Sequence, residues 1–374
     1  MSSGNLKIVV CGLSITSAWG NSHAGIYRSL LGALLERGHS VLFLEREVPW
    51  YTGHRDLTGP LCSAVQLYSS LEELRGRFAP DVADADLVIV GSHVPNGIDV
   101  ARWATGTAGG ATAFYDMDTP MTIGHVAQGD CDYLSSELIP LFNVYFSLTG
   151  GPLLEEIVHV YGARAVKALY CCVDTKLYRP MPTEREWDLG FLGAYRADRQ
   201  RALEEYFLRP ARMWPEGWFA AAGSQYPPDM EWPQNVDRIQ SLPEVERPVF
   251  YNSLRFSLNV TRTDLARAGW CPNARILEAA ACGVPVISDA WEGLDSFFKV
   301  GSEIFAAAST PEVVSILRKT PEKERLTMAE KALSRVLTSH SSGRRAEELE
   351  GYTREILDRS PRRRKAAHVS AASA

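Results

Sequence analysis

Short hydrophobic runs alternate along the chain with longer segments in which hydrophobic residues recur every three or four positions. The runs indicate buried parallel strands, and the longer segments indicate the amphipathic helices that connect them. We expect the first helix to begin after Asn21 and to end at Gly38, with Ile26, Leu30 and Leu34 on its buried face. In the first half of the chain we expect strands at 6–11, 40–44, 87–90, 111–115, 144–148 and 168–173.

A polar stretch interrupted by prolines, 174–187, separates this pattern from a second one. Its composition is typical of a connection between domains. Both halves open on a strand that ends in a glycine, Gly12 or Gly193, and is followed by a loop and a helix. In the second half we expect helices at 198–207 and 274–282, and strands at 189–192, 218–222, 256–260, 284–288 and 303–307.

These patterns predict an α/β fold with two Rossmann-like domains that face a central cleft. We place an N-terminal domain at 1–175 and a C-terminal domain at 186–330. The pattern of 331–358 predicts closing helices. The basic and then small residues of 359–374 predict a disordered tail.

Composition and charge narrow the class of protein. The chain has 374 residues, of which 45% are hydrophobic and 22% charged, as in ordinary globular proteins. Its net charge of −6 provides no overall attraction for nucleic acid, which we do not expect as a main partner. No hydrophobic run approaches the roughly 20 residues of a membrane span, and no leader pattern occurs, so we expect a cytoplasmic location. Seven cysteines without a C-x-x-C pair predict neither disulfides nor a zinc site.

Several common motifs are absent from the sequence. No G-x-G-x-x-G follows either opening strand, and neither a P-loop, a G-x-S-x-G nor an H-E-x-x-H occurs. These absences remove most of the support for a dinucleotide-dependent oxidoreductase, a P-loop ATPase, a serine hydrolase or a zinc protease.

The most informative stretch is 273–289, Asn-Ala-Arg-Ile-Leu-Glu-Ala-Ala-Ala-Cys-Gly-Val-Pro-Val-Ile-Ser-Asp. It predicts a helix with Glu278 in its middle, followed by a turn at Gly283 and a strand. The small alanines allow a ligand to approach closely, and a carboxylate there can accept hydrogen bonds from both hydroxyls of a ribose. A solvated or salt-bridged helix glutamate is the alternative.

This stretch resembles the nucleotide-binding helix of GT-B glycosyltransferases with a group 1 type of C-terminal domain. Four other segments resemble the CgeB-like branch of these enzymes: 114–120, 188–199, 259–262 and 288–293. The resemblance covers about residues 5–320. It implies a transferase that moves a sugar from a nucleoside diphosphate sugar, UDP-sugar foremost, to an unidentified hydroxyl acceptor. Retention of configuration, independence from metal and the absence of a cofactor are also implied. An epimerase of the same fold and a non-catalytic nucleotide-sugar-binding protein stay open.

The resemblance assigns the donor site to the second half of the chain. Glu278 would hold the ribose, while Arg196 and Arg262 would neutralise the diphosphate and stabilise the leaving group. Both arginines follow a predicted strand at its carboxyl end, where open α/β sheets bind ligands, although either could form a surface salt bridge instead. The other donor residues are Gly193, Tyr195, Asn259, Asn273 and Ala274, the last two through backbone N–H groups at a helix start.

The acceptor side is expected in the first half, at Gly12, His23, Asp116 and Asp118. His23 or Asp118 could act on the acceptor hydroxyl as a base, although His23 could merely cap its helix. Asp116-Met-Asp118 is similar to the D-x-D metal ligands of another glycosyltransferase class. We do not expect a metal site here, because the pair lies more than 70 residues before the donor motifs.

Aromatic residues leave two questions open. Many retaining relatives carry a second glutamate eight positions before the ribose glutamate, and this chain has Trp270 there, which leaves the stereochemical outcome and the sugar open. Trp214, Trp218 and Trp232 could stack on sugars, but core or surface packing is the simpler interpretation.

Overall fold

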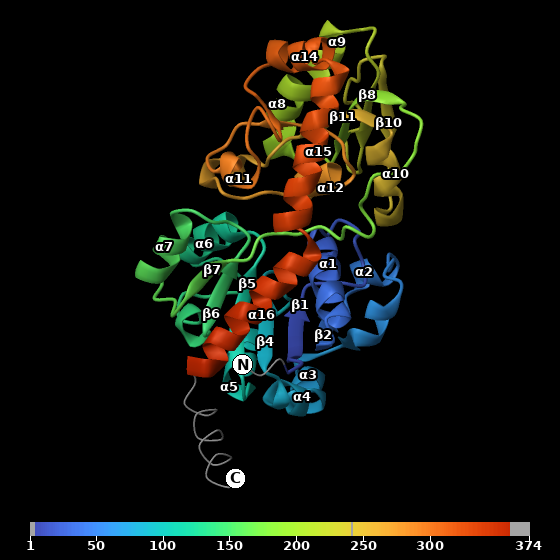
Figure 1. The fold of residues 1–374 in the computed structure, drawn as a ribbon. Coiled ribbons are helices and arrows are strands. Elements are labelled where there is room, and N and C mark those ends of the chain that lie inside the picture. The colour runs from blue at the N-terminus through green and yellow to red at the C-terminus, as the bar shows by residue number, and fades with distance from the viewer. Residues whose placement is uncertain (1–3, 241, 360–374) are drawn as a thin grey trace. The chain divides into compact units, whose positions relative to one another are not determined.

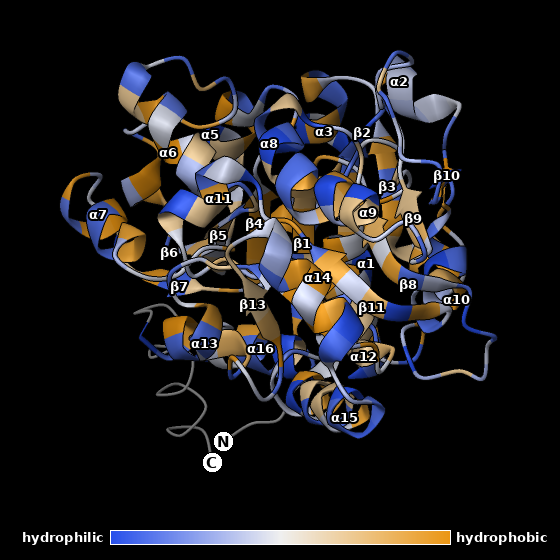
Figure 2. Ribbon diagram, turned by 90° about the horizontal axis from the view of Figure 1, so that it is seen from above, coloured by the Kyte–Doolittle hydropathy of each residue, from blue (hydrophilic) through white to orange (hydrophobic). Residues whose placement is uncertain are grey.

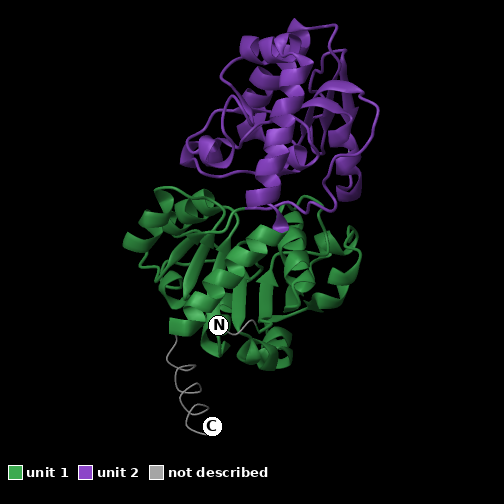
Figure 3. Cartoon of the chain, in the orientation of Figure 1, with its two compact units in different colours: residues 1–170, 343–374 green, residues 171–342 purple. Residues whose placement is uncertain are grey.

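A computed structural model describes residues 4–240 and 242–359 of the chain (Figure 1). The described residues form two parallel β-sheets covered by helices, one of seven strands and one of six. They divide into two compact units, the first made of residues up to 170 together with those from 343 onward, and the second of residues 171–342 (Figure 3). The predicted α/β class with two Rossmann-like domains is confirmed. Of the predicted disordered tail, 359–374, the first residue, Arg359, ends a helix, and the rest lies outside the described residues.

The sheet of the first unit has the strand order β3-β2-β1-β4-β5-β6-β7. Its strands are β1 (Lys7–Gly12), β2 (Ser40–Arg46), β3 (Val65–Tyr68), β4 (Leu87–Gly91), β5 (Ala111–Asp116), β6 (Val144–Ser147) and β7 (Val166–Ala168). The chain order changes direction between β1 and β4, so the loops that leave these two strands at their carboxyl ends diverge. Such a switch point is where open α/β sheets bind ligands.

The helices of the first unit are α1 (His23–Glu36), α2 (Pro49–Thr52), α3 (Leu71–Arg77), α4 (Ala79–Asp84), α5 (Gly97–Thr107), α6 (Thr119–Gln128), α7 (Leu153–His159) and α16 (Ser342–Arg359). Helix α16 returns from the far end of the chain to this unit, where the Tyr352 ring lies 5.8 Å from Phe146 on β6. Glu350 of the same helix accepts from the guanidinium of Arg37 and lies 2.9 Å from His39. The last described helix therefore belongs to the first unit.

The sheet of the second unit has the order β10-β9-β8-β11-β12-β13. Its strands are β8 (Trp187–Leu192), β9 (Phe219–Ala222), β10 (Val236–Ile239), β11 (Leu254–Asn259), β12 (Val286–Asp289) and β13 (Phe305–Ala307). Its helices are α8 (Gln200–Leu203), α9 (Arg209–Met213), α10 (Arg247–Asn252), α11 (Thr263–Ala268), α12 (Ala274–Ala281), α13 (Leu294–Phe297), α14 (Thr310–Lys319) and α15 (Glu322–Ser339). In this sheet the chain order of the strands changes direction between β8 and β11, which makes this pair the switch point of the second unit.

Hydrophobic side chains from the sheets and the inner helix faces form a separate core in each unit. Helices α14 and α15 carry both hydrophilic and hydrophobic residues along their length (Figure 2). This is the distribution of helices with one buried and one solvated face. None of the helices in the described ranges is long and hydrophobic enough to cross a membrane.

The structure corrects several element predictions. The strand expected at 168–173 ends at Ala168, because Val173 is the one residue after it in this range that bridges to another segment, and it makes only an isolated bridge, to Ser341. The short edge strands β3 and β10 were not predicted, since their residues are only partly buried and lack a hydrophobic run. The helix expected at 198–207 continues to Met213 through a π-turn at Glu204–Leu208. Pro210, which cannot donate an N–H, lies two residues after this turn.

Candidate functional site

The turn after β8 is tightly built around Gly193. A side chain at this position would come within 2.8 Å of the Arg199 guanidinium and 2.9 Å of the Phe191 ring. The Arg199 guanidinium donates to the carbonyl of Ala194, and the Tyr226 hydroxyl donates to the carbonyl of Gly193 at 2.8 Å. A larger residue at Gly193 would therefore displace the Arg199 guanidinium, and Arg199 was not predicted from the sequence.

Three arginines lie in one region at this edge of the sheet. The pKa of Arg199 is lowered, chiefly because the group is buried; Tyr226 opposes the shift, and the charges of Arg275 and Arg196 add to it. Arg196 is exposed and lies 3.2 Å from Asp198, and the Arg275 guanidinium has no hydrogen bond or ion pair with the described residues. We call Arg196, Arg199 and Arg275 the arginine cluster. Among the described residues, one carboxylate, that of Asp198, forms an ion pair with the cluster, so the cluster carries excess positive charge and attracts an anion.

Helix α12 begins beside this cluster, and Arg275 lies in its first turn. Asn273 caps the helix: its Oδ1 accepts from the amides of Arg275 and Ile276 at 3.0 and 3.3 Å. Its Nδ2 donates to Oδ1 of Asn259, which is buried at the end of β11 and donates to Ser288. The cap leaves the amide of Ala274 without an acceptor in the described parts of the chain, so one helical N–H is open to a ligand.

Glu278 is buried in the middle of α12, with 6% of its surface exposed. The Tyr251 hydroxyl of α10 donates to its Oε2 at 2.9 Å, and Arg247 Nη1 lies 4.0 Å from its Oε1. Burial alone would lower the pKa of Arg247, but the charge of Glu278, helped by Tyr178 and Glu244, raises it above the ordinary value. Glu278 is therefore not a solvated helix residue, and sequence reasoning missed both of its partners.

Arg262, at the start of α11, is engaged by a neighbour. Its Nε and Nη2 contact the two carboxylate oxygens of Asp264 at 3.2 and 2.7 Å, and its side chain is 18% exposed. This contact is the salt-bridge alternative considered for Arg262. Trp270 has a positive φ of 43° and packs against Gly293, where an added side chain would lie 2.4 Å from the indole. Such a φ is rare for a tryptophan and stores backbone strain.

In the first unit, the loop between β1 and α1 is fixed by a buried carboxylate. Glu45, at 1% exposure, accepts from the hydroxyls of Ser14 and Thr16 and from the amides of Ile15 and Thr16. Asn21 then bridges the loop and the helix, since its Oδ1 accepts from the amide of His23. The loop therefore holds the His23 side chain, which is 6% exposed, in a defined place.

Three side chains from separate loops meet at the carboxyl end of this sheet. His23 Nε2 lies 3.3 Å from Asp118 Oδ2, and His93 Nε2 lies 3.2 Å from the same oxygen. Asp118 follows β5 and precedes α6, whereas His93 follows β4. His93 was not predicted from the sequence, although its place two residues after the buried strand β4 could have marked it.

Asp116 has a different environment from Asp118. It is fully buried and accepts from Tyr145, from Thr122 at 2.7 Å and from the Asp118 amide. Burial raises its pKa despite these hydrogen bonds. Gly12 is also fixed by packing, because a side chain there would lie 2.1 Å from the Phe43 ring. Asp116 and Gly12 thus have structural roles beside any contact with a ligand.

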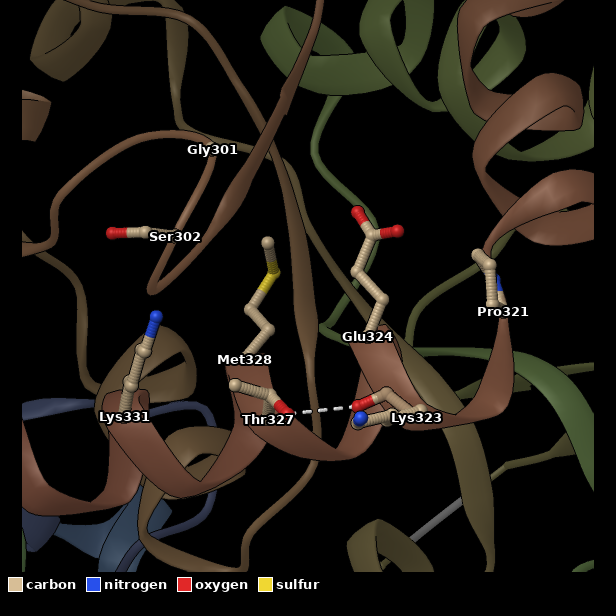
Figure 4. Close-up of a pocket in the computed structure, with 8 residues that line it drawn as sticks. All are labelled: Gly301, Ser302, Pro321, Lys323, Glu324, Thr327, Met328 and Lys331. Carbon is tan, nitrogen blue, oxygen red and sulfur yellow. Dashed lines mark hydrogen bonds between the residues drawn. The ribbon is translucent and has the colours of Figure 1, made fainter.

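The three tryptophans considered for sugar stacking take part in packing. The Trp214 and Phe219 rings lie 6.2 Å apart, Trp232 packs on Tyr226 at 5.1 Å, and the exposed Trp218 donates to Asp237 at 2.7 Å. A separate surface pocket of about 400 Å³ lies between α15 and the turn at Gly301 and Ser302 (Figure 4). Its other lining residues are Pro321, Lys323, Glu324, Thr327, Met328 and Lys331, so it includes none of the candidate site residues.

Solved structures identify the architecture. The two parallel-sheet units match glycosyltransferases of the GT-B fold, and the chain has this fold. Sucrose-phosphate synthase from Thermosynechococcus elongatus is 13% identical with a TM-score of 0.64, and the match covers 95% of this chain and all of that one. HepE from Anabaena in complex with UDP-glucose is also 13% identical with a TM-score of 0.64, over 94% of this chain and all of HepE. An alpha-glucosyltransferase in complex with UDP-glucose and DNA containing an abasic site is 14% identical with a TM-score of 0.70, over 94% and 100%.

A family model adds a sequence match to this fold assignment. Residues 199–351 match the family described as glycosyl transferase-like. The matched range contains Arg199, Arg275 and Glu278 of the second unit. No curated protein matches the sequence.

Proposed function

We propose that this protein is a glycosyltransferase that moves a sugar from a nucleoside diphosphate sugar, a UDP-sugar, to a hydroxyl acceptor. The observation that carries the proposal is the placement of a buried carboxylate, Glu278, on the same helix as Arg275 of the arginine cluster, which pairs with none of the described residues. A nucleoside diphosphate combines the two groups that these side chains recognise, a ribose diol and two phosphates. The UDP and UDP-glucose in the titles of matching structures support a uridine nucleotide.

Donor recognition begins with the ribose. Tyr251 holds Oε2 of Glu278, and Oε1 has only the 4.0 Å contact with Arg247 among the described residues. Oε1 can therefore accept from the ribose hydroxyls, while Oε2 retains a second lone pair for the same diol. A hydrogen bond to a charged group contributes about 1.5 to 3 kcal/mol, which makes Glu278 a major source of nucleotide affinity.

The diphosphate would lie between the Gly193 turn and the start of α12. There the arginine cluster and the open amide of Ala274 would neutralise its charge, and this charge grows on the leaving group as the glycosidic bond breaks. Tyr195 and Asn259 frame the same edge of the sheet. Arg262 keeps its proposed catalytic role by exchanging Asp264 for a phosphate oxygen. Fixed guanidinium groups would thus replace a divalent ion at the donor diphosphate.

The acceptor hydroxyl would bind in the first unit at the switch point of its sheet. His23 or Asp118 would take the proton of this hydroxyl, with Gly12 and Asp116 supporting the same strand ends. In the second unit, Trp270 would lie where a retaining relative places its second glutamate. We propose retention of configuration without a carboxylate at this position, with the leaving-group phosphates held by the arginine cluster.

The experiment is acceptor-dependent release of UDP. The full chain is incubated with UDP-glucose and other UDP-sugars, with and without a hydroxyl-rich acceptor extract, and UDP and free sugar are quantified. A transferase releases UDP in step with a new glycoside and yields little free sugar. Binding of UDP-sugars without any acceptor-dependent release would overturn the transfer step and leave a nucleotide-sugar-binding protein.

A further inference from the structure

The three loops that leave β1, β4 and β5 place two imidazoles and one carboxylate around a common point. His23 is the first residue of α1, His93 lies in the loop after β4, and Asp118 directly precedes α6. Their ligating atoms all lie within 4.8 Å of one another. This His-His-Asp cluster lies in the first unit and comprises only residues of that unit.

The separations of the ligating atoms match those around a metal ion, and the contact between His23 and Asp118 is also within hydrogen-bond distance. Asp118 Oδ2 lies 3.3 Å from His23 Nε2 and 3.2 Å from His93 Nε2. A tetrahedral zinc ion with ligand bonds of about 2.0 Å separates its ligand atoms by about 3.3 Å. His93 Nε2 is buried and makes no hydrogen bond with the described residues, although it faces the carboxylate. A cation between the three atoms would give His93 Nε2 a partner and would also bind His23 Nε2 and Asp118 Oδ2.

The site is held in place before any ion binds. His23 is 6% exposed and Asp118 is 16% exposed, whereas His93 is 36% exposed. The backbone of His93 has a positive φ of 61°, which directs its ring against Tyr133, with ring centroids 4.4 Å apart. Residues other than glycine adopt such a conformation mainly where the surroundings impose it, often at functional sites. Three protein ligands leave the fourth position of a tetrahedral ion to water or to a hydroxyl.

The chemistry of the ligands selects the kind of ion. Two imidazole nitrogens and one carboxylate oxygen suit zinc and other late divalent transition metals, whereas magnesium and calcium require mainly oxygen ligands. We propose that His23, His93 and Asp118 bind one divalent transition-metal ion of the zinc type. This site differs from the D-x-D pair considered in the sequence, because Asp116 takes no part in it. It goes beyond the proposed donor binding and replaces the sequence-based expectation of a chain without metal. With the ion bound, His23 Nε2 and Asp118 Oδ2 act as its ligands and not as the base for the acceptor hydroxyl.

The surroundings of His23 limit the affinity of this site. When an imidazole binds a metal through Nε2, its Nδ1 carries the proton and usually donates to a carbonyl or carboxylate. His23 Nδ1 is buried and has no such partner among the described residues. Loss of an outer partner typically weakens metal binding by about 10- to 100-fold. We therefore expect affinity well below that of a closed structural zinc site.

The experiment is metal titration of the full chain after removal of metals with a chelator and dialysis. Zn²⁺ binding is followed by calorimetry, and Co²⁺ binding by its visible absorption, which distinguishes four-coordinate from six-coordinate ions. H93G removes one ligand at a backbone position that glycine adopts freely, and D118N removes the charge at nearly constant shape. H125A is the matched control, because the exposed His125 also contacts one carboxylate, Asp130 at 2.9 Å, but has no second histidine.

The wild type and H125A should bind one ion, with a four-coordinate Co²⁺ spectrum. H93G and D118N should bind it at least about 100-fold more weakly while unfolding at an unchanged temperature in the absence of metal. Absence of binding in the wild type would overturn the proposal. So would equal affinity in H93G, an equal loss in H125A or a six-coordinate spectrum. UDP affinity, measured on the same samples, reports on the proposed donor site independently.

Discussion

The Tyr251 hydroxyl donates a hydrogen bond of 2.9 Å to Oε2 of Glu278, on a helix whose first turn carries Arg275. Without Tyr251, a carboxylate with 6% exposure would lose its one hydrogen bond among the described residues. The bond fixes the rotamer of Glu278 and so determines where its other oxygen can meet a ligand. Tyr251 therefore acts on nucleotide binding through Glu278.

Removal of this hydroxyl in Y251F should weaken UDP binding about 10-fold, since one hydrogen bond to a charged group contributes about 1.5 to 3 kcal/mol. Isothermal titration calorimetry of UDP provides the measurement. Y206F is the control, because Tyr206 is a partly buried tyrosine that packs on the core of the same unit. An affinity in Y251F equal to that of the control would show that Tyr251 does not position Glu278 for the nucleotide.

The arginine cluster should distinguish nucleotides by their phosphates. In R275M, affinity for UDP should fall about 10-fold or more while affinity for uridine stays constant, because only the diphosphate meets the lost charge. Competition binding with uridine, UMP and UDP measures this difference. R318M, at an exposed position on α14, controls for the general change in charge. Equal losses for uridine and UDP would instead indicate damage to the ribose or base region.

The contact between Arg262 and Asp264 makes a kinetic prediction. If Arg262 exchanges Asp264 for a phosphate as the leaving group departs, R262A should lower kcat about 100- to 1,000-fold with a smaller change in KM. Steady-state kinetics with the UDP-sugar found in the release assay tests this. A variant that keeps the wild-type kcat would assign Arg262 to a surface ion pair alone.

Donor binding should not require a divalent ion, because the guanidinium groups neutralise the diphosphate. Calorimetry of UDP in excess EDTA should therefore give the same affinity as in added magnesium or manganese. The measurement concerns nucleotide affinity alone, so an ion at the His-His-Asp cluster does not affect its interpretation. A Kd that rises steeply in EDTA and recovers with magnesium would show that the donor diphosphate binds through metal.

The Glu278 helix could be predicted from the sequence because its features are local: a capping Asn273, a run of small residues and Gly283 at the end. The roles of His93 and Arg247 could not, since each role depends on contacts with residues distant in the chain. His93 meets His23 and Asp118 only because β4 lies beside β1 and β5 in the sheet. The two edge strands were missed for a related reason: their pairing depends on a neighbouring strand, while their own side chains are only partly buried.

The measurement that tests the account most directly is UDP binding to wild type and E278Q by calorimetry. Glutamine keeps the shape of the side chain and can still accept from Tyr251, but it lacks the charge that the ribose hydroxyls would meet. E330Q, at an exposed position of α15, is the matched control. The wild type and E330Q should bind UDP equally, and a folded E278Q should bind it at least about 10-fold more weakly. Equal UDP affinity in all three proteins would contradict the assignment of Glu278 and, with it, the proposed donor site.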